Sequence, residues 1–330
     1  MQLVKGMGCM YSSLYDWNRG GYPGFSKYLE KLYYISYQKD NHQTIEDFLN
    51  HLETYFYELI RMGFVTVDNY EFIMNRMEMI QKVHILPKNM DRHYAFVKNQ
   101  DVYLNPSING KYGLSNSSFQ LMVHSHEIGH LINHGWREEA KRFTNTIGNI
   151  RSVKDALERE ELEPKHIFYG FQLLDEVVTQ EVSERVTYQS ICRERPKFSK
   201  RTDKRIFNFQ PYVTNYSIYG EFQEFAEKFA RNLDFLNCKD DDKLEVLRKL
   251  SMASFRPDFI KKIEDEMYHN PKKVYPLIMM LAVMGRVKEA TYQLVGEECS
   301  ENDDFCINSY LPLFQEMSNT KTDHFTYRKK

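Results

Sequence analysis

The sequence has few cysteines, no long apolar run and almost no net charge. Its five cysteines are odd in number and scattered, which argues against a disulfide framework or a zinc site built from cysteine pairs. The formal net charge is only -2 over 330 residues, so no global electrostatic field favours nucleic acid or an anionic membrane. We therefore expect neither of these as a partner.

Long hydrophobic segments are also missing. The most apolar stretch, 275–287, is well short of the roughly 20 residues that span a bilayer, and it contains Arg286. We interpret it as a buried helix. The first residues lack the sustained apolar run of a signal peptide, so we expect a cytoplasmic protein. The apolar fraction of 42% is ordinary for a chain that folds around its own core.

The first part of the chain has the apolar spacing of helices. Apolar residues recur at three- and four-residue intervals along residues 45–60, which predicts a helix with one buried face. They are Ile45, Phe48, Leu49, Leu52, Phe56, Leu59 and Ile60. A second helix is predicted from Asp68 to about Ile85, with Glu71 in the capping-box position. Pro87 then stops it.

The pattern changes in the next segment. Apolar residues alternate with other residues over 94–96 and 102–104, on either side of a polar connection, which predicts a β-hairpin. A helix is then predicted to begin at Ser117 and to end at Gly135. The charged residues 138–165 predict one or two solvated helices or a lid. Helical spacing returns from Ile167 to about Val186 and again from Glu221 to roughly Val295, before a polar C-terminal tail.

Two histidines one helical turn apart mark a candidate site in the predicted central helix. His126 and His130 lie in the segment HSHEIGHLINH, and their spacing places both imidazoles on one helix face. Their nitrogens can then bind one Zn²⁺ at about 2.0–2.1 Å. Glu127 lies about 100° around the helix, where it can reach a water in the open coordination position and act as a general base. Apolar neighbours favour this interpretation, because burying these polar side chains requires compensation.

This pattern resembles the zincin metallopeptidases. The metzincin branch carries a third histidine where this chain has Trp136, so the resemblance is to the gluzincin branch, whose third ligand is a glutamate on a second helix. The downstream segment LLDEVVTQ is similar to that second helix, and Glu176 matches the ligand position. Gln180 stands where many members carry a carboxylate that orients a zinc histidine. Asp175 and Glu181 remain rival ligands.

The resemblance also implies a tyrosine or histidine that stabilises the oxyanion, beyond the third ligand. Tyr219 is the first choice among three tyrosines in the segment before residue 221, and ordinary packing is an equal interpretation for it. His166 is a weaker candidate. By the same resemblance, the hairpin strand Asp101–Asn105 corresponds to an edge strand that pairs with extended substrate.

We expect an α+β, mostly helical protein with a zincin-like catalytic core at 89–235 and a small sheet before the active-site helix. Residues 1–88 and 236–330 are predicted to form helical flanking regions. The predicted function is that of a zinc-dependent peptidase acting on a peptide or protein. Two alternatives stay open: a zinc-containing regulatory or toxin-like protease specific for one protein partner, and a non-catalytic interaction protein in which zinc joins two helices.

Overall fold

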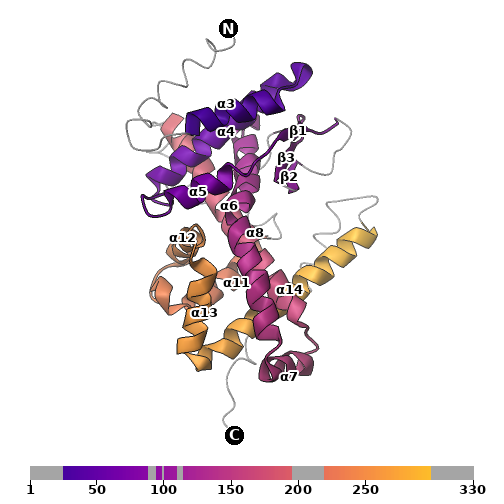
Figure 1. The fold of residues 1–330 in the computed structure, drawn as a ribbon, viewed down its shortest axis with the longest axis vertical. Helices are drawn as coiled ribbons and strands as arrows, with labels where there is room; N and C mark the ends of the chain where they lie inside the picture. The colour runs from indigo at the N-terminus through magenta and orange to yellow at the C-terminus, as the bar shows by residue number, and fades with distance from the viewer. Residues whose placement is uncertain (1–24, 88–93, 99, 110–113, 195–218, 299–330) are drawn as a thin grey trace. The chain divides into compact units, whose positions relative to one another are not determined.

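The computed structural model describes residues 25–87, 94–98, 100–109, 114–194 and 219–298. These residues form many helices and one small sheet, so the fold is α+β and mostly helical, as predicted (Figure 1). The chain divides into two compact units, 1–132 and 133–330. The division falls inside one long helix, α6 (Asn116–Gly148), which contributes to both units.

In the described part of the N-terminal unit, three helices precede the sheet. They are α3 (Phe25–Ser36), α4 (His42–Arg61) and α5 (Tyr70–Met77), with a short 3-10 helix, η1 (Lys39–Asn41), after α3. The predicted apolar face of α4 is confirmed, because all but one of its members are buried. The exception is Ile60, which is half-buried. Burial of this face, more than local helix propensity, stabilises α4.

The second predicted helix is much shorter than expected. It ends at Met77, and residues 83–85 form the strand β1 (Val83–Ile85) where the prediction continued the helix. That part of the prediction is wrong because Val83 pairs with Val102, a partner in a different part of the sequence. Apolar spacing within a short window does not reveal such a partner.

The sheet has three strands. β2 (Ala95–Lys98) and β3 (Asp101–Leu104) form the predicted antiparallel hairpin, and β1 pairs with β3 in parallel. The order β1-β3-β2 places β3 in the centre. The prediction that Asp101–Asn105 is an edge strand is therefore wrong, because β3 has a neighbouring strand on each side. In the hairpin turn, Gln100 has a φ of 69°, the left-handed conformation that tight hairpin turns use.

The helix α6 is far longer than predicted. It begins after Ser115, whose Oγ accepts a hydrogen bond from the backbone N–H of Ser118 (3.3 Å), and it continues past Gly135 to Gly148. The charged residues from 138 onward are helical, as predicted, but this second half of α6 is solvated on one face only. Its buried side chains recur every three or four residues and form one face: Trp136, Ala140, Phe143 and Ile147.

The C-terminal unit is a bundle of helices around one large core. Besides the second half of α6, it contains α7 (Arg151–Arg159), α8 (Pro164–Glu194), α11 (Tyr219–Arg231), η2 (Asp234–Leu236), α12 (Lys243–Ser254), α13 (Phe259–His269) and α14 (Pro271–Glu298). The closest packing is between α8 and α14. A Cβ atom on Gly285 of α14 would lie 1.8 Å from the carbonyl oxygen of His166 in α8, so only glycine allows this approach.

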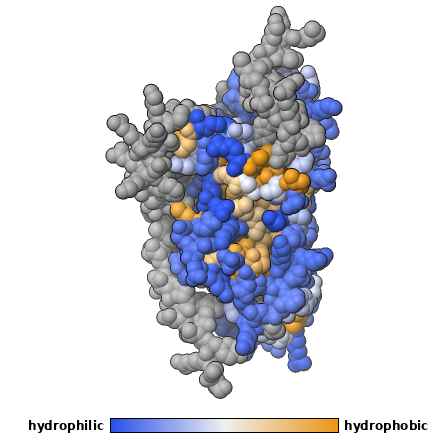
Figure 2. All heavy atoms as spheres, turned by 90° about the vertical axis from the view of Figure 1, so that its left-hand side faces the viewer, coloured by the Kyte–Doolittle hydropathy of each residue, from blue (hydrophilic) through white to orange (hydrophobic). Residues whose placement is uncertain are grey.

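The apolar stretch 275–287 lies in α14, and most of its large apolar residues are buried or half-buried, as predicted. Among the described residues, no helix combines the length and apolarity that crossing a membrane requires. In the view of Figure 2, most of the coloured residues are hydrophilic, and some hydrophobic residues are exposed among them.

Candidate metal centre

The helix α6 presents His126 and His130 on one face. Their Nε2 atoms lie 3.0 Å apart, and their ring planes are nearly perpendicular, at 88°. Both side chains are half-buried, whereas Ile128, Leu131 and Ile132 are buried. These apolar side chains pack against the protein interior on the other sides of this turn of α6. Their packing therefore determines the direction in which the face with the two imidazole rings points.

The distance between the two nitrogens suits a shared metal ion. In a tetrahedral site with Zn–N bonds of about 2.0–2.1 Å, neighbouring nitrogens lie roughly 3.3 Å apart. The observed separation of 3.0 Å between the Nε2 atoms of His126 and His130 is close to this value. Without a cation, one ring has to donate an N–H to the other. With a cation, the Nε2 lone pairs of His126 and His130 can both be directed at the ion.

A buried polar cluster, which we name the Asp175 clamp, holds α8 against the second half of α6. The side-chain NH₂ group of Asn133 donates to the Asp175 carboxylate (3.0 Å), and Arg137 forms an ion pair with the same carboxylate. Asp175 and Asn133 are both fully buried. Asn133 follows His130 by three residues on α6, and Glu176 follows Asp175 on α8, so the clamp joins residues that are close in sequence to the candidate ligands.

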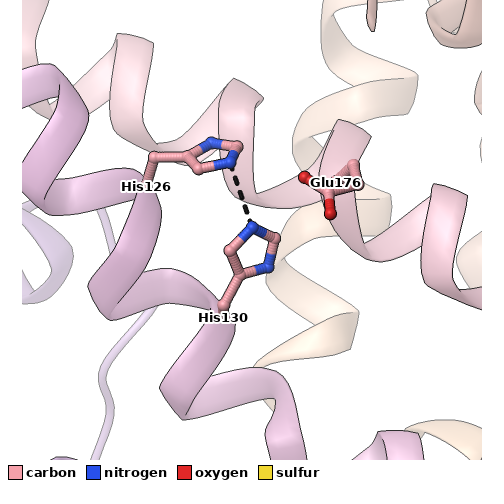
Figure 3. Close-up of side chains that lie close together, drawn as sticks. All are labelled: His126, His130 and Glu176. Carbon is pink, nitrogen blue, oxygen red and sulfur yellow. Dashed lines mark hydrogen bonds between the residues drawn. The ribbon is translucent and has the colours of Figure 1, made fainter. Parts of the chain in front are cut away.

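The predicted ligands His126, His130 and Glu176 come together. Each offers one ligand atom, and these atoms all lie within 4.8 Å of one another (Figure 3). Within the described parts of the chain, this is the one group of three such side chains. Two imidazoles and one carboxylate are a common ligand set for catalytic zinc, and they leave a fourth position for water. The residues present therefore fit a zinc ion.

The rival carboxylates have other partners. Asp175 belongs to the clamp. Oε1 of Glu181 accepts a hydrogen bond from Nε of Arg185 (2.6 Å) and forms an ion pair with Nη2 of the same residue (2.5 Å). The side-chain NH₂ group of Gln180 donates a hydrogen bond to Oε1 of Glu184 (2.8 Å), so this NH₂ group already has a partner on α8. Burial, helped by the nearby Glu181 carboxylate, raises the pKa of Glu184 to about 8. Glu184 is therefore mostly protonated at neutral pH.

His124 lies in a buried histidine pair. Its Nδ1 is 2.9 Å from Nδ1 of His51 in α4, and its ring packs edge-on against Phe48. Burial lowers the pKa of His51 to about 4, and it lowers the pKa of His124 well below its usual value. Both rings are therefore neutral at physiological pH, and one donates to the other. His124 thus packs within the N-terminal unit.

Two predicted catalytic residues have different outcomes. Glu127, the predicted general base, follows His126 on α6 and is half-buried. Tyr219 is the first residue of α11, but its side chain lies outside the described residues. The other two candidates, Tyr212 and Tyr216, also lie outside them. The role of a tyrosine in stabilising the oxyanion therefore stays a prediction.

His166, the weaker candidate for that role, has both ring nitrogens engaged. Nδ1 accepts a hydrogen bond from the backbone N–H of Glu163 (2.8 Å), and Nε2 lies 2.8 Å from Oε2 of Glu289 in α14. The ring is also buried. These contacts assign His166 to the packing of α8 against α14, where it supports the close approach of the two helices.

Sequence reasoning missed a cation next to Glu176. Lys288 in α14 is half-buried, and its Nζ makes a long hydrogen bond to Oε1 of Gln172, one turn before Glu176 on α8 (3.4 Å). Burial lowers the pKa of Lys288, while the Glu176 and Asp175 carboxylates oppose that shift. No local signal marks this residue, because Lys288 and Glu176 are far apart in the sequence and meet only through helix packing.

Comparison with known proteins adds no further constraint. No family model, no curated protein and no solved structure matches this chain. The function is therefore inferred from the chemistry of the site, in which His126, His130 and Glu176 offer three ligand atoms within 4.8 Å of one another.

Proposed function

We propose that this protein is a zinc-dependent peptidase, with a zincin-like catalytic core of the gluzincin type, that hydrolyses a peptide or protein substrate in the cytoplasm. One observation supports the proposal above all others: the ligand atoms of His126, His130 and Glu176 lie within 4.8 Å of one another. Glu127, a carboxylate that is not a member of this group, is the next residue after His126 on the same helix. A metal site with a neighbouring base has the components of a hydrolase.

Each residue has a distinct task in this mechanism. His126 and His130 bind as neutral imidazoles, and Glu176 supplies the anionic ligand. When bound, zinc polarises the substrate carbonyl and lowers the pKa of the attacking water towards about 7. Glu127 takes the proton from that water as it attacks, and later transfers the proton to the leaving amine.

The Asp175 clamp argues against a purely structural zinc ion. Asn133 and Arg137 already fasten α6 to α8 through Asp175, so no metal is needed to join these helices. Structural zinc sites also usually have four protein ligands, whereas the group here provides three. Both points favour a site that leaves a position open for water.

The proposal is tested with a mixed peptide library, zinc and a chelator. The wild-type protein should bind one zinc ion per chain and cleave part of the library, and the chelator should abolish cleavage. Glu127→Gln should keep zinc but lower kcat by about 10²–10⁴, because only the base is removed. His126→Ala should lose stoichiometric zinc.

The matched control is Glu138→Gln, which alters an exposed carboxylate on the same helix. It should change neither zinc content nor cleavage. Undiminished cleavage by Glu127→Gln would remove Glu127 from the mechanism. A full zinc complement in His126→Ala would exclude His126 as a ligand, and the peptidase proposal would then lose its main support.

A further inference from the structure

The close packing of α14 on α8 brings one cation to the metal ligand Glu176. Gly285 lets α14 approach the backbone of α8 at His166, and Lys288 lies one turn further along α14. Its Nζ reaches Gln172, which precedes Glu176 by one turn on α8. Lys288 and Glu176 are therefore neighbours within the C-terminal unit, and their position depends on two helices in direct contact.

The charges around Glu176 are unevenly balanced. Asp175 is paired with Arg137 in the clamp, so these two groups neutralise each other. The ammonium group of Lys288 contacts Gln172, one turn before Glu176 on α8, and the Glu176 carboxylate favours its charged form. Once a dication binds the Glu176 carboxylate, that carboxylate no longer compensates the positive charge of Lys288. The metal and Lys288 would then add positive charge near Glu176, which favours an anionic oxygen on the substrate.

We propose that the ammonium group of Lys288 binds the negatively charged oxygen that forms on the substrate at this metal site, an inference that rests on the proposed peptidase function. When the water oxygen bonds to the carbonyl carbon, an electron pair moves onto the carbonyl oxygen and the water proton goes to Glu127. Lys288 donates N–H hydrogen bonds to that oxygen and keeps its own protons. Its flexible side chain, with three donors, suits this role.

The test uses full-length protein with Lys288→Met, Lys288→Arg and the control Lys272→Met, an exposed lysine on the same helix. Zinc affinity is measured by competition with a chromophoric chelator. Binding of phenylphosphonate, a tetrahedral anion, to the zinc-loaded protein is measured by calorimetry. Where wild-type protein cleaves a peptide, kcat and KM are measured as well. Urea unfolding establishes that each variant is folded, and Lys288→Gln replaces Lys288→Met if that variant is not.

Removing the cation should have opposite effects on the two ligands. Lys288→Met should bind zinc several-fold more tightly, because a repelling charge is gone. It should bind phenylphosphonate at least about tenfold more weakly and lower kcat by about 10²–10³, with little change in KM. Lys288→Arg should retain phosphonate binding, and Lys272→Met should match the wild type.

Several results would overturn the proposal. Unchanged or weaker zinc binding by Lys288→Met would show that its charge does not reach the metal position. Unchanged phosphonate affinity, or a rise in KM at constant kcat, would show that Lys288 does not act on the developing anion. If the wild type cleaves no peptide but the zinc and phosphonate effects appear, the peptidase proposal fails while anion binding by Lys288 stands.

Discussion

Replacing Asp175 by asparagine should loosen the contact that sets the position of Glu176. The substitution keeps the size of the side chain and an oxygen acceptor for Asn133, but it removes the negative charge that pairs with Arg137. The new amide also places an NH₂ group near the guanidinium group, so two donors face each other. The clamp should therefore lose its ion pair and keep one hydrogen bond.

The size of the effect follows from burial. The Asp175 side chain has an exposed fraction of 0%, and that of Arg137 is 26% exposed. Breaking a fully buried pair costs about 3–5 kcal/mol, whereas an exposed pair is worth about 0–1 kcal/mol. Because Arg137 keeps some contact with water, we expect Asp175→Asn to lower the free energy of unfolding by about 2–3 kcal/mol. Zinc affinity should fall by about tenfold, as it does when residues behind metal ligands are changed.

The assay is urea unfolding of the zinc-free protein, followed by zinc titration of the folded protein. A double-mutant cycle with Arg137→Met isolates the pair, and its coupling energy should be about 1–2 kcal/mol. The control is Glu158→Gln, which breaks an ion pair with Lys154 in α7 whose side chains are both more than 60% exposed (3.8 Å). That control should change stability by no more than about 0.5 kcal/mol.

Three results would refute this reasoning. If Asp175→Asn unfolds at the same urea concentration as the wild type, the buried ion pair with Arg137 does not stabilise the protein. If stability falls but zinc affinity is unchanged, the clamp does not position Glu176. Additive effects of the two substitutions would also show that Asp175 and Arg137 act independently.

Two further predictions concern α8 and its contact with α14. Glu184 has a folded-state pKa of about 8, above its ordinary value of 4.5, so the folded state binds more protons between these pH values and stability should decrease as pH rises through that window. The slope of this pH dependence is at most about 1.4 kcal/mol per pH unit, and Glu184→Gln should flatten it. Urea unfolding from pH 4.5 to 8 measures the slope. An unchanged slope would mean that Glu184 is not its source. Gly285→Ala should destabilise the protein by about 2 kcal/mol, because the added Cβ would meet the His166 carbonyl oxygen at 1.8 Å, a cost that outweighs the gain in helix propensity. Thermal unfolding measures this effect, and an unchanged or higher melting temperature would contradict the close approach of α8 and α14.

Where a feature depends on neighbours in the sequence, the sequence predicted it well. The buried face of α4 follows from apolar spacing alone, and the β2–β3 hairpin follows from two alternating segments with a short connection. The placement of His126 and His130 on one face of α6 has the same local origin, because a helix brings residues four apart together wherever it lies.

In other places, packing between distant parts of the chain decided the secondary structure against the local sequence signal. Gly135 is a plausible end for the central helix, but burial of Trp136, Ala140 and Phe143 stabilises α6 beyond it. Long-range pairing likewise decided that Val83–Ile85 is a strand. In both places the deciding contacts come from residues outside any window that a periodicity argument covers.

The sequence alone thus determined which side chains are able to bind a metal, since that depends on their chemistry and on the regular geometry of a helix. Only the tertiary structure decided which of the neighbouring carboxylates, Asp175 or Glu176, would join the histidines, because that depends on how Asn133 and Arg137 engage the first of them. It also decided that Lys288 contacts Gln172, one turn before Glu176, since local sequence does not reveal contacts between helices that are far apart in the chain.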